Sequence, residues 1–359
     1  MTDIARLKTD YPWIETPLIV GAPMRLIALA DLATEISRAG GIGFIGAGTD
    51  VSNLASHLQA AQQLLQNQNT TLPTREGMLP IGVGFINWGV ALSETIPIIE
   101  RYRPAAAWFF APSSIASLME WTEKSRNASP ETKIWVQIGS VREAVDALNA
   151  RPDVLVVQGT DAGGHGLVQG ASIVSLVPEV DDAVRGIARA AGFEAPVILA
   201  AGGIVEGRSA AAALALGASG VVLGTRFLAA KEANIAKGYQ DEVVRVNDGG
   251  QTTVRTKVYD DLRGTTGWAQ THNARGIINR SFKDALKGLD EAENKRLYEQ
   301  DMRKGDAGWG AEARMTTYAG AGVGLVRAIA GAGPIVRDVR SQAVKVLEKF
   351  TRAAASGKL

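Results

Sequence analysis

The sequence contains no cysteine among its 359 residues. This absence excludes disulfides, a thiolate nucleophile, iron–sulfur clusters and cysteine-ligated zinc. Histidine is scarce as well, because only His57, His165 and His272 occur. A metal site built from several histidines would have to draw on three distant parts of the chain, so we expect no metal.

Long apolar runs and an excess of charge are also missing. No stretch reaches the roughly 20 apolar residues that a transmembrane helix requires. The formal net charge of +1 creates no broad field for nucleic acid or an anionic membrane. The first residues are charged and lack the apolar core of a signal peptide. We therefore expect a cytoplasmic protein with a small-molecule ligand and no nucleic-acid or membrane partner. A homodimer is compatible with the sequence.

The chain ends in Gly357-Lys358-Leu359. Glycine stands where a peroxisomal Ser-Lys-Leu address has serine, so the peroxisome is the weaker of the two expected localisations.

Apolar segments without polar alternation recur along the first two thirds of the chain. Segments of this kind are typical of parallel strands buried on both faces. Each is followed by a stretch with helical periodicity. The predicted strands are Leu18–Ala22, Gly41–Gly46, Leu79–Ile86, Ala105–Phe110, Lys133–Ile138, Asp153–Gln158, Pro196–Ala201 and Gly220–Gly224.

Helices are predicted after each strand. The clearest signal is GGIVEGRSAAAALALGA, which indicates a turn, an Ala/Leu helix and a glycine stop. The predicted helices are Ala28–Ala39, Val51–Asn67, Ser93–Arg101, Ser113–Asn127, Val141–Ala150, Glu179–Ala191, Glu206–Leu216 and Phe227–Lys237.

Eight strand–helix units in about 230 residues match a (β/α)8 barrel, whose usual size is ~250 residues. An open doubly wound sheet is the alternative. Eight consecutive units favour the barrel. We therefore predict an α/β fold, a (β/α)8 TIM barrel over residues 1–237.

Residues 238–359 have a different pattern, and we expect a mixed, mainly helical elaboration that packs on the barrel and covers the substrate pocket. Asp241–Tyr259 contains two β-rich runs around Asn247–Gly250, which predicts a hairpin. Helices are predicted over Ser281–Lys304 and Glu312–Ala330.

Catalytic groups of such barrels lie just after the strands. The stretch VQGTDAGGHG follows the sixth predicted strand and places His165 among Gly163, Gly164 and Gly166. These glycines let backbone or a flat ligand come close to an imidazole that can act as a base, a donor or a cation. The alternative is a glycine-rich turn whose histidine only hydrogen-bonds the loop. Asp161 is expected to have at most a supporting role.

The loops after the last two strands form the usual phosphate site of these barrels. Gly202 and Gly203 follow the seventh strand, and Gly224 and Thr225 follow the eighth. Backbone N–H groups at such glycines can point at an anion, and the threonine hydroxyl adds a donor. The pattern predicts a phosphorylated ligand, with tight packing at the barrel rim as the alternative.

GIGFIG, residues 41–46, satisfies the Gly-x-Gly-x-x-Gly dinucleotide pattern. In a dinucleotide fold these glycines must follow a strand and open a helix. Here the apolar residues between the glycines form the strand itself, so the match is interpreted as accidental.

Other strand ends supply apolar and amide groups. Ala22, Pro23 and Met24 offer a small, rigid surface on which a ring can lie. Neutral amides suit the polar edge of a heteroaromatic ring. A phosphorylated ligand with a flat heterocycle is indicated, and flavin mononucleotide (FMN) fits that description. The amides expected around it are Asn87, Gln137 and Gln158.

Several of these motifs together resemble the nitronate monooxygenase family, formerly called 2-nitropropane dioxygenases, and its fungal-type members most closely. The resemblance extends from about Pro17 to about Val336. It is carried by GAPM, AGGIGFIGAG, LPIGVGFINW, WFFAP, VQIGS, VQGTDAGGHG, AAGGIVEGR and LGTRFLAAKEA.

The resemblance implies an FMN-dependent barrel that oxidises alkyl nitronates with molecular oxygen to a carbonyl compound and nitrite. It implies that His165 is the active-site histidine, which takes a proton from a neutral nitroalkane or holds the anionic nitronate. The glycines and Thr225 match the family's phosphate loops. Thr265–Asn279 and Tyr318–Val326 also look like family segments, and His272 in the former is taken as a surface or lid residue.

Two other functions use the same scaffold. One is an FMN-dependent NAD(P)H reductase of enoyl thioesters or quinones, although the chain shows no convincing NAD(P)H motif. The other is a flavin-binding protein without catalysis, against which the retention of His165 in its glycine-rich setting argues.

Overall fold

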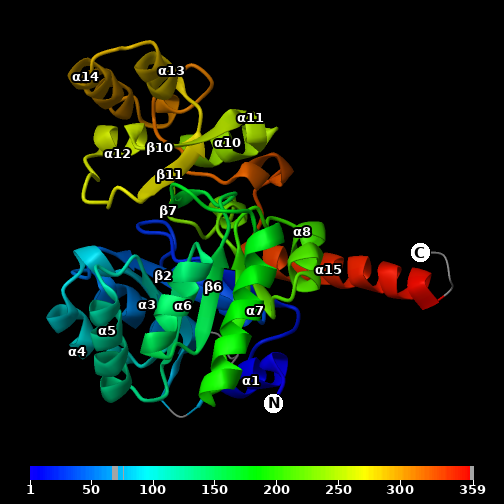
Figure 1. Cartoon of the computed structure of the whole chain (residues 1–359). Helices are drawn as coiled ribbons and strands as arrows, with labels where there is room; N and C mark the ends of the chain where they lie inside the picture. The colour runs from blue at the N-terminus through cyan, green and yellow to red at the C-terminus, as the bar shows by residue number, and fades with distance from the viewer. Residues whose placement is uncertain (67–71, 76, 356–359) are drawn as a thin grey trace.

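A closed barrel of eight parallel strands forms the body of the molecule (Figure 1). The structure, a computed structural model, describes residues 1–66, 72–75 and 77–355. The last strand pairs with the first, from Leu18 with Gly220 to Gly21 with Leu223, so the sheet is closed. The predicted TIM barrel is therefore confirmed. Its strands are β1 (Leu18–Gly21), β2 (Ile42–Gly48), β3 (Leu79–Ile86), β4 (Pro104–Phe110), β5 (Lys133–Ile138), β6 (Val154–Gln158), β8 (Val197–Ala201) and β9 (Gly220–Leu223).

Large side chains fill the inside of the barrel. The rings of Phe44 and Trp135 lie 4.9 Å apart between centroids, and Trp108 packs on both. The first helix, α1 (Asp3–Asp10), and the turn after it cover the amino-terminal end of the barrel, where Trp135 Nε1 donates to Tyr11 Oη at 2.7 Å. A barrel filled in this way leaves only its carboxyl-terminal end open to a ligand.

Helices pack around the outside of the strands, mostly where the sequence predicts them. The exception in length is α7, which begins six residues before the predicted Glu179 and includes Pro178. Proline removes only one helical hydrogen bond there, to Val174, whose side chain is exposed to solvent. Asn67, the predicted end of the second helix, lies outside the described residues. The outer helices are α2 (Ala30–Arg38), α3 (Leu54–Gln66), α4 (Leu92–Tyr102), α5 (Ile115–Ala128), α6 (Val141–Ala147), α7 (Ile173–Ala191) and α8 (Gly207–Ala215), with short 3-10 turns η1 (Asn87–Gly89) and η2 (Leu148–Ala150).

The eighth barrel helix comes from the end of the chain. The predicted helix Phe227–Lys237 is wrong, because the structure forms only the short α9 (Thr225–Leu228) there. The long α15 (Ala332–Ala355) packs against α8 and α2 and completes the ring. Gly207 permits this contact, since a Cβ at that position would lie 2.2 Å from Gln342 Cβ. The expected segment 238–359 therefore does not lie entirely over the barrel mouth.

The residues between the barrel and α15 form a cap, defined here as residues 237–331 together with β7 (Figure 1). Its centre is a three-stranded antiparallel sheet in the order β10-β11-β7. The cap elements are α10 (Lys237–Arg245), α11 (Gly249–Thr252), β10 (Thr253–Thr256), α12 (Val258–Arg263), β11 (His272–Ile277), α13 (Arg280–Leu286), α14 (Glu291–Met302), η3 (Gly305–Gly308), η4 (Ala321–Leu325) and, from the barrel half of the chain, β7 (Gly164–Leu167).

The hairpin predicted around Asn247–Gly250 is wrong. Asp248 adopts a left-handed conformation that starts α11, and β10 pairs with β11 rather than with the segment before the turn. Gly249 packs on η4, where a Cβ would lie 2.2 Å from the carbonyl oxygen of Ala321. Tertiary packing therefore decides the local structure there.

The helix predicted over Glu312–Ala330 is also wrong, because only η4 is helical within it. This glycine-rich segment instead passes closely over the barrel loops, and a Cβ on Gly320 would lie 2.5 Å from the carbonyl oxygen of Asp161. The helices predicted over Ser281–Lys304 are confirmed as α13 and α14.

Among the described residues, no helix is both long and apolar enough to cross a membrane. The same residues contain no group of three or more metal-ligating side chains. The carboxyl-terminal tripeptide lies outside the described part of the chain.

Arg340 should anchor α15 to the barrel. Its guanidinium is buried and donates to the carbonyl oxygens of Pro17, Ala39 and Gly40. Arg340→Met leaves the carbonyl oxygens of Pro17 and Ala39 without this donor, and that of Gly40 with only the N–H of Glu15. We therefore expect the free energy of unfolding in urea to fall by about 2–4 kcal/mol. Arg352→Met, which alters an exposed arginine of the same helix, is the control and should change it by less than about 0.5 kcal/mol. Equal effects of the two substitutions would contradict this account.

Candidate active site

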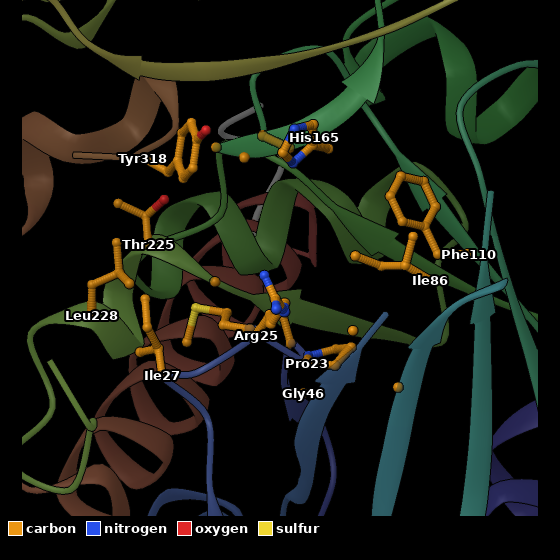
Figure 2. Close-up of a pocket in the computed structure, with 18 of the residues that line it drawn as sticks. Pro23, Arg25, Ile27, Gly46, Ile86, Phe110, His165, Thr225, Leu228 and Tyr318 are labelled. Carbon is orange, nitrogen blue, oxygen red and sulfur yellow. The ribbon is translucent and has the colours of Figure 1, made fainter. Parts of the chain in front are cut away.

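A cavity of about 740 Å³ lies at the carboxyl ends of the barrel strands, beneath the cap (Figure 2). This volume is in the range of small-molecule and cofactor sites, about 300–1,000 Å³. The structure brings together every site residue expected from the sequence except Asn87. Those that line the cavity are Ala22, Pro23, Met24, Gln137, Gln158, Gly163, Gly164, His165, Gly202, Gly203, Gly224 and Thr225.

Asn87 lies behind the wall of the cavity. Its side chain is buried, and its Oδ1 accepts a hydrogen bond from the backbone N–H of Phe110 at 2.9 Å. Its Nδ2 has no partner among the described residues. Asn87 therefore supports Phe110, which does line the cavity.

The floor of the cavity is the segment from Ala22 to Met24 (Figure 2). Two glycines let it pass close over the strands: a Cβ on Gly84 would lie 2.3 Å from Pro23 Cβ, and one on Gly46 would lie 2.4 Å from the carbonyl carbon of Met24. Gly46 belongs to GIGFIG, which forms β2. The glycines of that motif therefore serve close packing within the barrel, and the interpretation of the dinucleotide match as accidental is confirmed.

One end of the cavity is built from the loops after β8 and β9. Gly202 and Gly203 have positive φ angles of 104° and 74°, which favour glycine. The backbone N–H groups of Gly203 and Thr225 donate to no acceptor in the described part of the chain. A Cβ on Gly224 would meet nothing nearer than Ala22 Cβ at 3.8 Å. Open space and free N–H donors together suit an anionic group such as a phosphate.

A chain of amide side chains links the barrel interior to the opposite end. Trp108 Nε1 donates to Gln137 Oε1, and Gln137 Nε2 donates to Gln158 Oε1 at 2.7 Å. Gln158 Nε2 in turn donates to the carbonyl oxygen of His165. Each glutamine therefore has one Nε2 hydrogen left for a ligand in the cavity.

His165 is part of the cap sheet. It lies in β7 directly opposite Ala274 of β11, so its backbone is fixed by an antiparallel ladder. The loop before it touches the cap as well, since a Cβ on Gly163 would lie 2.5 Å from the backbone nitrogen of Gly320. The glycines around His165 thus allow close contact between barrel loop and cap.

The imidazole of His165 is enclosed by three cap side chains. Its Nε2 lies 2.8 Å from Asp260 Oδ1, and its ring stacks on Trp268 with 3.9 Å between centroids and 11° between planes. Tyr318 lies at the third side, 5.7 Å away between centroids. The His165 side chain keeps 16% of its surface exposed, against 4% for Asp260. It is therefore rigidly held and still accessible from the cavity.

Two arginines of the cap sheet hold the loop that precedes β7. Arg255 donates to the carbonyl oxygens of Thr160 and Ala162, and Arg275 also donates to that of Thr160. Burial and the neighbouring charge of Arg275 lower the pKa of Arg255 to about 10, so it remains a cation at neutral pH.

The charged groups that line the cavity are cations. Arg25 and Arg263 line it, and its lining includes no carboxylate in the portion that the structure describes. Arg263 also lies over the ring of Tyr318. Burial and the carboxylate of Asp260 raise the pKa of Tyr318 well above its usual range, so its hydroxyl stays protonated. The cavity is therefore suited to anions.

His272 is not the surface residue that the sequence suggested. It is buried in β11, with Phe110 and Trp268 packed against its ring. Burial, together with the charge of His165, lowers its pKa to about 4. His272 is therefore neutral near pH 7 and is a structural part of the cap beside the site.

Sequence reasoning assigned no role to Asp260 and did not single out Trp268 or Tyr318 within the segments it noted. Asp260 lies in VYDDLR, where adjacent acids on a short helix are typical of a solvated surface. Only the pairing of β7 with β11 brings it next to His165.

These features define a capped (β/α)8 barrel with free N–H groups at one end of its cavity, an amide-lined wall and an enclosed histidine. The model of the family described as nitronate monooxygenase matches residues 120–341. The nitronate monooxygenase npaC of Metarhizium robertsii is 46% identical over 345 residues, which cover 95% of each chain. A nitronate monooxygenase of Neurospora crassa is 35% identical, over 98% of this chain and 96% of the relative. The chain belongs to the nitronate monooxygenase family, as its sequence motifs predicted.

Solved structures share the fold. FabK from Thermotoga maritima has a TM-score of 0.72 at 23% identity, over 96% of this chain and 98% of FabK. Nitroalkane oxidase from Streptomyces ansochromogenes has a TM-score of 0.71 at 22% identity, over 96% of this chain and 99% of that chain. At this level of identity the likeness shows the barrel and its cap, and no particular activity.

The buried neutral state of His272 should make the protein less stable in acid. Below about pH 6.5 the unfolded chain protonates this residue, whereas the folded protein does so only near pH 4. Acidification from pH 7 to pH 5 therefore favours unfolding, by about 1–2 kcal/mol from this residue. The free energy of unfolding in urea should therefore fall less between pH 7 and pH 5 in His272→Gln than in the native protein. An equal fall in the two proteins would show that His272 is not responsible.

Proposed function

We propose that the cavity binds FMN and that the protein oxidises alkyl nitronates, and neutral nitroalkanes after removal of a proton, with molecular oxygen to a carbonyl compound and nitrite. The observation that carries the proposal is the arrangement of one cavity with an anion-binding end, a ring-sized apolar floor and an accessible histidine opposite. Membership of the nitronate monooxygenase family supports it.

The residues present fit FMN. The N–H groups of Gly203 and Thr225, beside the open space at Gly224, would hold the phosphate. The floor from Ala22 to Met24 would carry the flavin ring. The remaining N–H of Gln137 and of Gln158 would donate to acceptors at the polar edge of the ring. When bound, FMN supplies the electron transfer that the protein side chains lack.

The substrate fits the other end of the cavity. A nitronate carries its negative charge on the nitro oxygens and the carbon, and Arg263, which lies over Tyr318 beside His165, favours an anion there. Among the described residues that line the cavity, His165 is the only histidine and no carboxylate is present, so His165 is the side chain suited to take the proton of a neutral nitroalkane or to donate to a nitro oxygen. The cap then excludes water from this end, a role expected from the sequence for residues 238–359 as a whole.

His165→Asn should abolish most turnover without loss of the cofactor. The substitution keeps a polar side chain of similar reach but cannot exchange a proton, so we expect kcat/KM for a neutral nitroalkane to fall at least about 100-fold. Oxygen uptake and nitrite release are measured for both proteins at equal flavin content. Turnover equal to that of the native protein would contradict the role of His165.

Gly224→Ala should weaken FMN binding while leaving the fold intact. The added methyl meets no protein atom nearer than Ala22 Cβ at 3.8 Å, but it occupies the space assigned to the phosphate. We expect the Kd for FMN, measured by quenching of flavin fluorescence, to rise at least about tenfold, or ~1.4 kcal/mol. Gly186→Ala is the matched control, because a Cβ on Gly186 meets nothing within 4 Å and lies outside the cavity. An unchanged Kd for FMN in Gly224→Ala would contradict the placement of the phosphate beside Gly224.

A further inference from the structure

Asp260 is the one acidic side chain hydrogen-bonded to the His165 ring in the described structure. It lies on α12 of the cap, 95 residues further along the chain. The neighbouring His272 ring interacts with the charges of His165, Arg255 and Lys257, and Arg263 lies over Tyr318 beside the His165 ring. All of these are cationic or neutral. Asp260 therefore supplies the negative charge that the imidazole contacts.

The hydrogen bonds around Asp260 define which partner donates. Its Oδ1 accepts from the hydroxyls of Thr265 at 2.9 Å and Tyr318 at 3.2 Å, and it lies 2.8 Å from His165 Nε2. Its Oδ2 is buried and has no partner in the described part of the chain. Donors converging on one oxygen suit an ionised carboxylate that only accepts. His165 must then carry a hydrogen on Nε2.

A hydrogen on Nε2 leaves Nδ1 as the basic atom of the neutral ring. Nδ1 makes no hydrogen bond within the described protein, and the ring lines the cavity. The stacked Trp268 prevents the ring from turning freely about its side-chain bonds. The same carboxylate also holds the loop that carries Trp268, since Thr265 bonds to both the side chain and the backbone carbonyl of Asp260.

We propose that Asp260 is a positioning residue for His165: it fixes the tautomer with hydrogen on Nε2, directs Nδ1 to the substrate and stabilises the imidazolium form. In this arrangement Nδ1 takes the proton of a neutral nitroalkane, or donates a proton toward the oxygens of a nitronate. The kinetic part of the proposal rests on the proposed function, whereas the tautomer and the charge coupling do not.

The first test observes the histidines directly in the protein without substrate. Only three histidines occur, so nitrogen-15 histidine labelling and long-range proton–nitrogen NMR resolve each ring, and His165→Asn identifies the signals of His165. In the native protein, neutral His165 should carry its hydrogen on Nε2. A hydrogen on Nδ1 would overturn the proposal without any variant of Asp260.

The second test removes the charge but keeps the acceptor. In Asp260→Asn, the amide oxygen still accepts from Nε2, yet the imidazolium loses its counter-charge. The pH midpoint of the His165 signals should therefore fall by about one unit, a tenfold loss of proton affinity. Asp261→Asn is the matched control, because Asp261 is the next residue of α12 and makes no hydrogen bond or ion pair with the ring in the described structure. Its substitution should shift the midpoint by less than about 0.3 units. Equal midpoints in the native protein and Asp260→Asn would overturn the proposal.

Kinetics separate positioning from a purely structural role. With a neutral nitroalkane, Asp260→Asn should lower kcat at least about tenfold with KM changed less than threefold, and the acid limb of the kcat/KM profile should move to lower pH. A loss confined to KM would indicate displacement of the loop at Thr265 and contradict the proposal. If the native protein turns over no nitro compound, the proposed function fails while the NMR result still decides the role of Asp260.

Discussion

The pairing of β7 with β11 is the contact on which the site depends. It joins the loop after a barrel strand to a strand more than 100 residues later in the chain, and it places His165 opposite Ala274. The arginines of the cap sheet reinforce this pairing by donating to Thr160 and Ala162. The barrel by itself would supply a floor and an anion-binding end, and the cap adds the histidine's orientation.

The barrel loops and the cap contribute different groups to the cavity. The barrel loops after β8 and β9 have glycines and free N–H groups, which suit a phosphate that must bind in one place. The cap contributes Asp260, Trp268 and Tyr318, which enclose the imidazole of His165. Changes in the cap can therefore alter the surroundings of this imidazole while the loops after β8 and β9 stay the same.

Much of this could be predicted from the sequence, for physical reasons. Strands buried on both faces have continuous apolar runs, so the eight barrel strands were recognisable. The glycine pairs and Thr225 follow directly after such runs, and local spacing was enough to find them. Asn87 was misplaced only slightly: it follows β3 as expected, but its side chain turns behind the wall to bond Phe110.

The errors arise where tertiary contacts override local pattern. Nothing in the sequence of Phe227–Lys237 shows that α15 fills the eighth helix position of the barrel. The contact of α15 with α8 joins segments that lie more than 100 residues apart in the chain. The strands β7, β10 and β11 are short and are stabilised by one another, so none has a strong signal of its own. Asp260 was missed for the same reason, since its contact with His165 exists only once the cap sheet has formed.

An anaerobic absorbance titration of the purified, FMN-reconstituted protein tests the central claim most directly. A nitronate is added in one cuvette, and NADH or NADPH in another. We expect the nitronate alone to reduce the flavin, at the one- or two-electron level. Reduction only by the nicotinamide would instead identify a reductase on the same barrel, and a flavin unchanged by either reagent would leave a binding role. A protein that cannot be reconstituted with FMN would contradict the proposal that the cavity binds this cofactor.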